Sequence, residues 1–297
     1  MNDIILITAA TGNIGSELVA LLASDPNIKE VRVGTRNPQS SKAQLLRAFA
    51  PHKVKPVAFD ITDGSTLEIA FTGVSRLCLI APLGDDINEF HQKTVHHATK
   101  AGVGYIVKVS VDGASAEVTE GPGAAHWVGE QLVRRSGLPS TMLRPTIFMQ
   151  HFLIVPGLYS RGDKQFYLPT GQSGLAFLDC RDIAYAAYKF LTNPSLANDL
   201  DEDYLAFTGP AALSGTEIAE QLTQLTGKQF TWEASMKAFE KHSKQVDSPL
   251  ELSAIYGAGA KGAFAEVKTD TFASILGRQP NSFAKFAFDN QYYFSTL

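Results

Sequence analysis

The chain has 297 residues, of which 44% are hydrophobic and 19% charged, with 26 Lys and Arg against 30 Asp and Glu. This composition is that of a globular protein and excludes collagen-like, low-complexity and disordered classes, which need excess glycine and proline or few apolar residues. A net charge of -4 without charge runs also predicts no nucleic-acid partner, because such binding normally requires a basic patch.

Targeting and redox signals are sparse. Cys78 and Cys180 have neither the spacing of a zinc motif nor that of a disulfide framework, which favours a reducing compartment. The amino terminus lacks the positively charged flank and long apolar region of a signal peptide. The longest run without a formal charge, 145–160, is interrupted by proline and glycine and is shorter than the ~20 apolar residues of a membrane span. We therefore expect a cytoplasmic protein with no membrane partner.

Short β-rich runs alternate with helical periodicity in the first half, which predicts βαβ units and a parallel sheet. A helix is expected to begin near Ile14, a second to end before Gly102 and a third to end before Gly137, because glycine is a common C-cap residue. The expected strands are 4–8, 31–34, 54–59, 77–81, 105–111 and 140–143.

The second half is less regular. Apolar spacing predicts a helix over 181–191, and 203–208 has the pattern of a strand. Ser214 and Glu217 have the spacing of a capping box, in which each side chain satisfies a free backbone donor of the other. This box is expected to open a helix that Gly227 closes.

These elements predict an α/β fold: a Rossmann-type doubly wound parallel sheet with a smaller C-terminal α+β substrate lobe. No Pro-rich or Ser-rich linker separates the two parts. We expect the NAD(P)-binding core to span 1–150, with 181–210 returning to it, and the substrate lobe to be made mostly of 151–297.

A turn rich in small residues joins the first strand to the first helix. A helix amino terminus presents free N–H groups and the positive end of its dipole, which suits a pyrophosphate. Gly12 would let a phosphate approach the backbone, and Gly15 would let the helix pack on the sheet. The usual third glycine is replaced by Ala9 and Ala10, so the turn is expected to keep its shape only if φ there is negative; a plain strand-to-helix turn is the alternative. The predicted cofactor-binding residues are Thr8, Ala10, Thr11, Gly12, Asn13, Ile14 and Gly15.

The residue at the end of the second strand predicts which dinucleotide binds. An acidic residue there would bind the ribose hydroxyls of NAD, but this chain has Arg36. Arginine makes bidentate bonds to phosphate, so Arg36 favours NADP(H), a solvated loop arginine being the alternative. Asp60 and Ile61 follow the third strand, where adenine would lie, and Ala81 and Pro82 follow the fourth, beside the ribose.

Short motifs are spread over nearly the whole chain, at 8–15, 35–38, Asp60, His126 with Glu130, 143–145, 181–184, 208–210 and 276–280. In these motifs the chain resembles the NmrA-like branch of the atypical short-chain dehydrogenase/reductases, including its quinone reductase and triphenylmethane reductase groups. That resemblance implies a Rossmann core that binds NAD(P), a small substrate lobe, and either NADPH-dependent reduction or a regulatory role as a cofactor sensor.

The expected catalytic helix departs from the usual short-chain dehydrogenase pattern. Where those enzymes have Tyr-x-x-x-Lys, this chain has His126-Trp-Val-Gly-Glu130, so the tyrosine acid is missing. His126 is the candidate proton donor, because its reference pKa near 6.5 suits transfer around neutrality; a plain helix-surface histidine or one that contacts the cofactor is the alternative. Lys108 and Ser110 share one face of the fifth strand at its carboxyl end, and Lys108 is predicted to support catalysis or to be a structural, ion-paired lysine. Ser110 is predicted to contact the cofactor.

The substrate side is predicted chiefly by resemblance, which places Pro145 and Phe148 beside the nicotinamide. Apolar and aromatic side chains that follow are candidates for the pocket wall, although a role in the core is the alternative for each. His151 stands where many relatives have asparagine. The predicted pocket residues are Met149, His151, Phe152, Tyr167 and Tyr256.

Two functions are compatible with these residues. The first is an NADPH-dependent oxidoreductase that transfers hydride to a conjugated or cationic small molecule, such as a quinone, enone, iminium ion or dye. The second is an NADP-binding redox sensor without turnover. No metal is expected, the partner is a small-molecule substrate, and a homodimer is compatible with the sequence.

Overall fold

The computed structural model describes residues 3–82, 84–154, 159–160, 165–169, 174–243 and 249–296. The chain divides into two compact units, each built from two separate stretches. Unit 1 comprises Met1–Arg144 and Cys180–Leu205, and unit 2 comprises Pro145–Asp179 and Ala206–Leu297. The expected boundary at residue 150 therefore falls inside unit 2, because the chain leaves unit 1 where its sixth strand ends.

One seven-stranded sheet organises unit 1, in the order β3-β2-β1-β4-β5-β6-β9. The described pairs from β3 to β6 are parallel, and Ile5 on β1 lies opposite Val31 of β2 on one side and Arg76 of β4 on the other. The chain reverses its direction of winding between β1 and β4, where doubly wound sheets open a ligand crevice at the carboxyl ends of their strands. The strands are β1 (Ile4–Ile7), β2 (Glu30–Thr35), β3 (Val54–Ala58), β4 (Arg76–Leu79), β5 (Tyr105–Val109), β6 (Ser140–Pro145) and β9 (Tyr204–Phe207).

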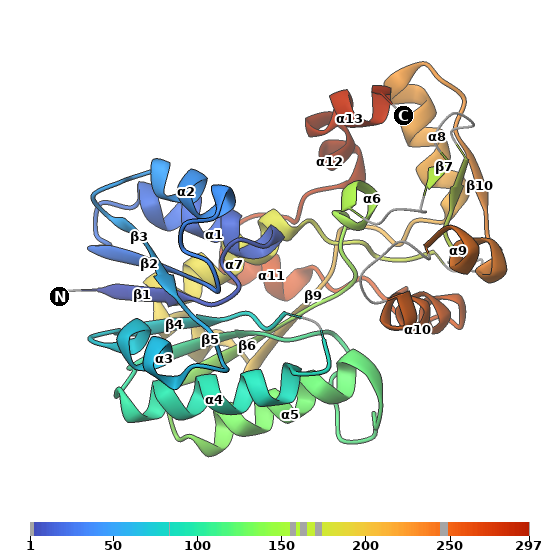
Figure 1. Ribbon diagram of the computed structural model, residues 1–297. Coiled ribbons are helices and arrows are strands. Elements are labelled where there is room, and N and C mark those ends of the chain that lie inside the picture. The colour runs from blue at the N-terminus through green and yellow to red at the C-terminus, as the bar shows by residue number, and fades with distance from the viewer. Residues whose placement is uncertain are drawn as a thin grey trace. The chain divides into compact units, whose positions relative to one another are not determined.

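Helices cover both faces of this sheet, with α1, α2 and α7 on one side and α3, α4 and α5 on the other (Figure 1). Side-chain caps begin two of them: Ser40 accepts from Ala43 N, and Asp63 accepts from Ser65 N. The helices are α1 (Asn13–Ser24), α2 (Ser41–Ala48), α3 (Gly64–Phe71), α4 (Ile87–Lys100), α5 (Gly121–Arg135) and α7 (Cys180–Thr192), followed by a 3-10 turn at Pro194–Asp199.

The core of unit 1 lies between the sheet and these helices. Phe59 packs its ring against Phe71 and Phe90, at centroid distances of 6.0 and 5.8 Å. Leu6 and Leu77 of the sheet are fully buried in the same cluster. Each such side chain contributes roughly 1.5–3 kcal/mol through burial, so the two layers hold the strand ends in fixed positions.

Unit 2 has a three-stranded sheet, in the order β10-β8-β7, and an aromatic core. The predicted capping box is confirmed: Ser214 Oγ accepts from Glu217 N, and Glu217 Oε2 accepts from Ser214 N at 2.8 Å. Gly227 closes that helix with a φ of 71°. The elements are α6 (His151–Ile154), β7 (Tyr159–Ser160), β8 (Gln165–Tyr167), α8 (Gly215–Thr226), β10 (Thr231–Glu233), α9 (Met236–Ser243), α10 (Pro249–Ala260), α11 (Asp270–Leu276), α12 (Phe283–Asp289) and α13 (Gln291–Thr296).

None of the helices in the described ranges is long and apolar enough to cross a membrane. The same ranges contain no group of three or more His, Cys, Asp or Glu side chains placed to hold a metal ion.

Candidate active site

The turn after β1 is held in place by Thr8. Its hydroxyl donates to Ile80 O at 2.7 Å and accepts from Ile80 N at 2.9 Å, and the side chain is fully buried. The sequence predicted Thr8 as a cofactor ligand. The structure instead joins its hydroxyl to the backbone that follows β4, so Thr8 aligns two adjacent strand ends.

The amino terminus of α1 is open to a ligand. Gly12 is the N-cap residue, and no side chain caps the helix, so the first N–H groups of α1 point beyond its end without a capping partner. Gly15 lies against the turn: a Cβ there would be 2.6 Å from the Cα of Ala10. Close packing of Gly15 on Ala10 therefore brings the positive end of the helix dipole up to the turn, an arrangement suited to an anion.

Ala9 does not meet the condition of a negative φ, because its φ is 46°, in the left-handed region. Alanine pays a steric cost of about 1–2 kcal/mol in this conformation. The turn nevertheless keeps the shape that a glycine would give it, with Gly12 N donating to Ala9 O at 3.0 Å. The missing third glycine is therefore replaced by a strained alanine rather than by a different turn.

Ala9→Gly is expected to raise the free energy of unfolding by about 1 kcal/mol, because glycine adopts a positive φ without the Cβ clash. The melting temperature should rise by about 2–4 °C in a thermal unfolding experiment. Ala10→Gly is the matched control: Ala10 is buried without a positive φ, so its replacement should lower stability. Equal losses in both variants would contradict the strain at Ala9.

Beyond β2 and β3, a positive and a negative side chain lie near each other. Arg36 is exposed just after β2, and Asp60 is half-buried after β3. Asp60 Oδ1 accepts from Thr62 N and Thr62 Oγ1 at 2.9 and 2.7 Å. These bonds lower the pKa of Asp60, and the guanidinium of Arg36 lowers it further. The carboxylate of Asp60 is thus ionised at neutral pH, at the same sheet edge as Arg36.

The predicted cofactor residues of unit 1 all follow the carboxyl ends of parallel strands. The turn follows β1, Arg36 follows β2, Asp60 and the buried Ile61 follow β3, and Ser110 follows β5. Ala81 and Pro82 follow β4; Ala81 is half-buried and Pro82 is exposed. Parallel strands end at a common edge, so the structure brings these positions together. Pro145 and Phe148 belong to unit 2.

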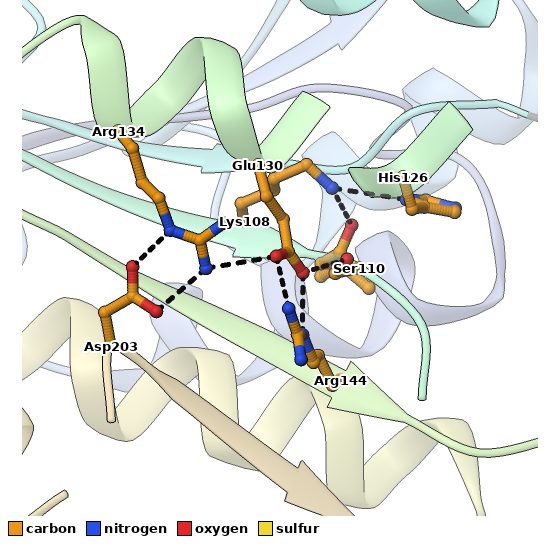
Figure 2. Close-up of polar contacts among 8 residues, drawn as sticks. Lys108, Ser110, His126, Glu130, Arg134, Arg144 and Asp203 are labelled. Carbon is orange, nitrogen blue, oxygen red and sulfur yellow. Dashed lines mark hydrogen bonds and ion pairs between the residues drawn. The ribbon is translucent and has the colours of Figure 1, made fainter. Parts of the chain in front are cut away.

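A polar cluster connects the end of β5 to α5. Figure 2 shows Lys108 and Ser110 facing His126 and Glu130. Residues two apart on a strand are separated by about 6.6 Å, and residues four apart on a helix by about 6 Å. The spacing of Lys108 and Ser110 therefore matches that of His126 and Glu130, so each side chain can reach its partner. Lys108 Nζ lies 3.2 Å from His126 Nδ1, and Ser110 Oγ donates to Glu130 Oε1 at 2.6 Å. The expectation that Lys108 and Ser110 share a face is confirmed.

Glu130 is the fully buried centre of this cluster. Arg144 donates to it through Nε at 2.8 Å and through Nη2 at 2.6 Å, and Arg134 Nη2 lies 3.1 Å away. Burial opposes ionisation of Glu130, but the bonds from Arg144 and Ser110 outweigh it and lower the pKa of the carboxyl. Ser110 was predicted to contact the cofactor; in the structure its hydroxyl donates a hydrogen bond to Glu130.

The two arginines of the cluster have further partners on its outer side. Arg134 donates to both carboxylate oxygens of Asp203, from Nε at 2.6 Å and from Nη2 at 2.8 Å (Figure 2). The guanidinium of Arg144 stacks on the ring of Tyr204 at 3.9 Å. Planar stacking and bidentate pairing are the contacts that stabilise a buried arginine best.

Lys108 and His126 are both buried beside this ion-pair cluster. Burial lowers the pKa of Lys108 to about 7. The positive charges of Arg144 and Arg134 also lower this pKa, whereas the negative charge of Glu130 raises it. Burial also lowers the pKa of His126 well below its usual value, as does the charge of Lys108. His126 was expected to titrate near neutrality; in the structure it is a neutral imidazole there.

The predicted pocket residues divide into two groups within unit 2. Four of them are at most 7% exposed and lie in the aromatic core of unit 2, which agrees with the alternative that they are core residues: Met149, Phe152, Tyr167 and Tyr256. His151 is half-buried, with Nδ1 3.1 Å from the hydroxyl of Tyr256, and burial lowers its pKa to about 4. Phe148, also half-buried, lies beside it with ring centroids 5.8 Å apart. Phe148 and His151 therefore retain exposed surface.

Four residues in or beside the polar cluster had no role predicted from the sequence: Arg134, Arg144, Asp203 and His91. Arg144 carried a usable signal: a charged residue at the end of an apolar strand requires a buried partner. Its partner, Glu130, was already identified by its spacing from His126.

Comparison with known proteins agrees with this architecture. Residues 1–270 match the NmrA-like family. An NAD(P)H azoreductase of Xenophilus azovorans is 31% identical over 293 residues, which cover 95% of this chain and 96% of the azoreductase. Quinone oxidoreductase 2 of Escherichia coli is 26% identical over 290 residues, covering 95% and 96% of the two chains.

Solved structures show the same fold. The NADPH complex of an E. coli quinone oxidoreductase superposes with a TM-score of 0.79 at 24% identity, covering 97% of this chain and 99% of the other. Triphenylmethane reductase from Citrobacter sp. gives a TM-score of 0.78 at 23% identity, covering 96% and 99%. The match along residues 1–270, together with the relative at 31% identity, establishes that the chain belongs to the NmrA-like family.

Proposed function

We propose that this protein is an NADPH-dependent reductase that transfers hydride to a flat, conjugated small molecule such as a quinone, an azo compound, an enone, an iminium ion or a dye. The observation that carries the proposal is the uncapped amino terminus of α1 at the sheet edge, with Arg36 beyond the neighbouring strand. The names of the azoreductase and quinone oxidoreductase relatives support the same class of reaction.

The residues at the sheet edge fit the cofactor. The free N–H groups of Asn13 to Gly15 would bind the pyrophosphate, and Gly12 leaves room for it. Arg36 would bind the 2′-phosphate, because a guanidinium forms charge-assisted, bidentate bonds to phosphate. Asp60 and Ile61 would border the adenine, and Ala81 and Pro82 would border the ribose. When bound, NADPH supplies the hydride.

The acceptor class follows from the acid that the protein offers. A simple ketone needs a strong proton donor as its oxygen becomes an alkoxide, and α5 has no tyrosine at position 126. Conjugated acceptors delocalise the incoming electron pair, and a cationic acceptor is simply neutralised by it. Such acceptors therefore need only a weak proton donor or none, and His126 is the candidate donor for quinones, azo compounds and enones.

The function is tested by following NADPH oxidation by the purified protein with each acceptor class. Turnover with at least one of these classes is expected, and little or none with simple aliphatic ketones. Tight NADPH binding without oxidation by any acceptor would overturn the reductase and favour the cofactor sensor instead.

Arg36→Ala is expected to weaken NADPH binding by about 10–100-fold, because a charge-assisted phosphate contact is lost, and to leave NADH binding nearly unchanged. Isothermal titration with both cofactors measures the two effects separately. Arg47→Ala removes an exposed arginine of α2 and is the matched control, which should leave both affinities unchanged. Equal binding of NADH and NADPH by the native protein would refute the role of Arg36.

A further inference from the structure

Lys108 carries a surplus positive charge in the buried cluster. Arg144 pairs with Glu130 and Arg134 pairs with Asp203, so these four charges cancel. The contacts of Lys108 Nζ are both to neutral acceptors, His126 Nδ1 at 3.2 Å and Val109 O at 3.4 Å (Figure 2). The cluster therefore stays balanced when Lys108 gives up its proton.

The contact between Lys108 and His126 fixes the tautomer of the imidazole. An ammonium group can only donate hydrogen bonds, so Nδ1 of His126 must be the acceptor while Lys108 is charged. The single proton of the neutral imidazole then lies on Nε2. When Lys108 is neutral, its lone pair can accept from Nδ1, and Nε2 is left without a proton. The two states differ by one proton and by the tautomer of His126.

We propose that Lys108 and His126 form a two-residue proton relay that supplies the proton accompanying hydride transfer. The inference rests on the proposed reductase function. The acceptor takes a hydride, with its electron pair, from NADPH, and its heteroatom takes the proton of His126 Nε2. At the same time the N–H bond of Lys108 breaks and an N–H bond forms at His126 Nδ1. The acceptor gains one hydride and one proton, NADP is released oxidised, and Lys108 becomes neutral.

The same path reverses to reset the pair. A solvent proton binds His126 Nε2, and the proton on Nδ1 returns to Lys108 Nζ. Neither the forward step nor the reset requires water to reach the lysine, which is fully buried. Without Lys108, a neutral imidazole that gave up its proton would become an imidazolate, which is far too basic to form readily near neutral pH.

The surroundings of Lys108 make it an acid of suitable strength. Its pKa of about 7 lies near physiological pH, whereas an ordinary lysine, with a pKa of about 10.4, would hold its proton too firmly. Glu130 opposes this lowering, and Arg134 and Arg144 promote it. The charged and titratable groups that act on Lys108 or feel its charge are His91 from α4, His126, Glu130 and Arg134 from α5, and Arg144 from β6.

The relay divides acceptors by their need for a proton. Menadione, a naphthoquinone, needs a hydride and a proton to become a hydroquinone. The cationic dye malachite green becomes its neutral reduced form by taking the hydride alone. Lys108 is protonated below about pH 7 and loses its proton above it, so kcat for menadione should fall about tenfold per pH unit on the basic side. The dye should show no such decline.

The experiment compares the two pH profiles in the native protein and in Lys108→Met. The variant is expected to lower kcat for menadione relative to kcat for malachite green by about 100-fold and to remove the basic decline. Lys108→Arg separates relay from positioning, because arginine can donate to Nδ1 but cannot give up its proton; a loss as large as that of methionine is expected. Lys100→Met, at an exposed lysine of α4, is the control and should change neither profile.

Three outcomes would overturn the relay: the same basic decline with both acceptors, a decline that persists in Lys108→Met, or full activity of Lys108→Arg. The first is measured on the native protein and does not depend on the folding of any variant. If the native protein reduces neither acceptor nor any other conjugated compound, the proposed function fails and the relay fails with it. Menadione reduction with a pH profile that Lys108→Met leaves unchanged refutes the relay alone.

Discussion

Glu130→Ala is expected to lower the free energy of unfolding by about 3–5 kcal/mol, because it removes one partner of a buried ion pair. The carboxylate is fully buried and accepts bonds from Ser110 and twice from Arg144, whose guanidinium would be left without its counter-charge. Arg134 would still hold Asp203. Urea denaturation of the variant measures the effect.

Two further variants show whether the loss comes from the unpaired charge. Glu89→Ala removes an exposed partner of Lys93 on α4 and should cost less than about 0.5 kcal/mol, as surface ion pairs do. Adding Arg144→Met to Glu130→Ala removes the stranded guanidinium and should recover much of the lost stability. If Glu130→Ala costs no more than Glu89→Ala, the ion-pair cluster does not stabilise the fold.

His91→Leu is expected to stabilise the protein, and to do so more strongly as the pH falls. His91 is fully buried, and neither ring nitrogen has a hydrogen-bond partner among the described residues. A Cβ on Gly129 would lie 2.7 Å from this ring, so the imidazole packs closely on α5. Replacing an unsatisfied buried polar group with an apolar side chain of similar volume should raise stability by about 1–3 kcal/mol at neutral pH.

The pH dependence follows from where His91 binds its proton. Burial, aided by the charge of Lys108, lowers the pKa of His91 to about 3, whereas the unfolded chain protonates it near 6.5. Between these values the unfolded state binds more protons, so the native protein loses up to about 1.4 kcal/mol per pH unit as the pH falls. His91→Leu removes this contribution, and its advantage should therefore grow from pH 6.5 toward pH 3.

Urea denaturation at several pH values compares His91→Leu with the native protein. His96→Leu, at an exposed position of the same helix, is the control and should stay within about 0.5 kcal/mol of the native protein at each pH. A constant difference between His91→Leu and the native protein across this range would show that His91 is not held neutral in the fold.

The parts of the fold that local sequence determines were predictable. Continuous apolar runs such as Ile4–Ile7 predict buried parallel strands, and Ser214 with Glu217 marks a helix start within four residues of chain. The edge location of Arg36 and Asp60 followed from the rule that ligands bind at the carboxyl ends of parallel strands. Alternation along a strand likewise placed Lys108 and Ser110 on one face.

The remaining features depend on contacts between distant segments. The left-handed φ of Ala9 is set by its neighbours in the turn, and nothing in an alanine indicates it. Phe152 and Tyr256 have the composition of a pocket wall as well as of a core, and only packing decides between the two. The pairing of Arg134 with Asp203 joins residues 69 positions apart, beyond the reach of any local pattern.

The interrupted chain path of the two units affects how the protein folds as it is synthesised. Residues 145–179 of unit 2 leave the ribosome before 206–297, so Phe152 has no Phe283 ring to pack against, at 5.1 Å, until the segment that carries Phe283 has been synthesised. Unit 1 completes earlier, when the 180–205 segment brings α7 to α1. The nascent chain therefore exposes part of an aromatic core while 206–297 are being synthesised, and during that interval it depends on protection from aggregation.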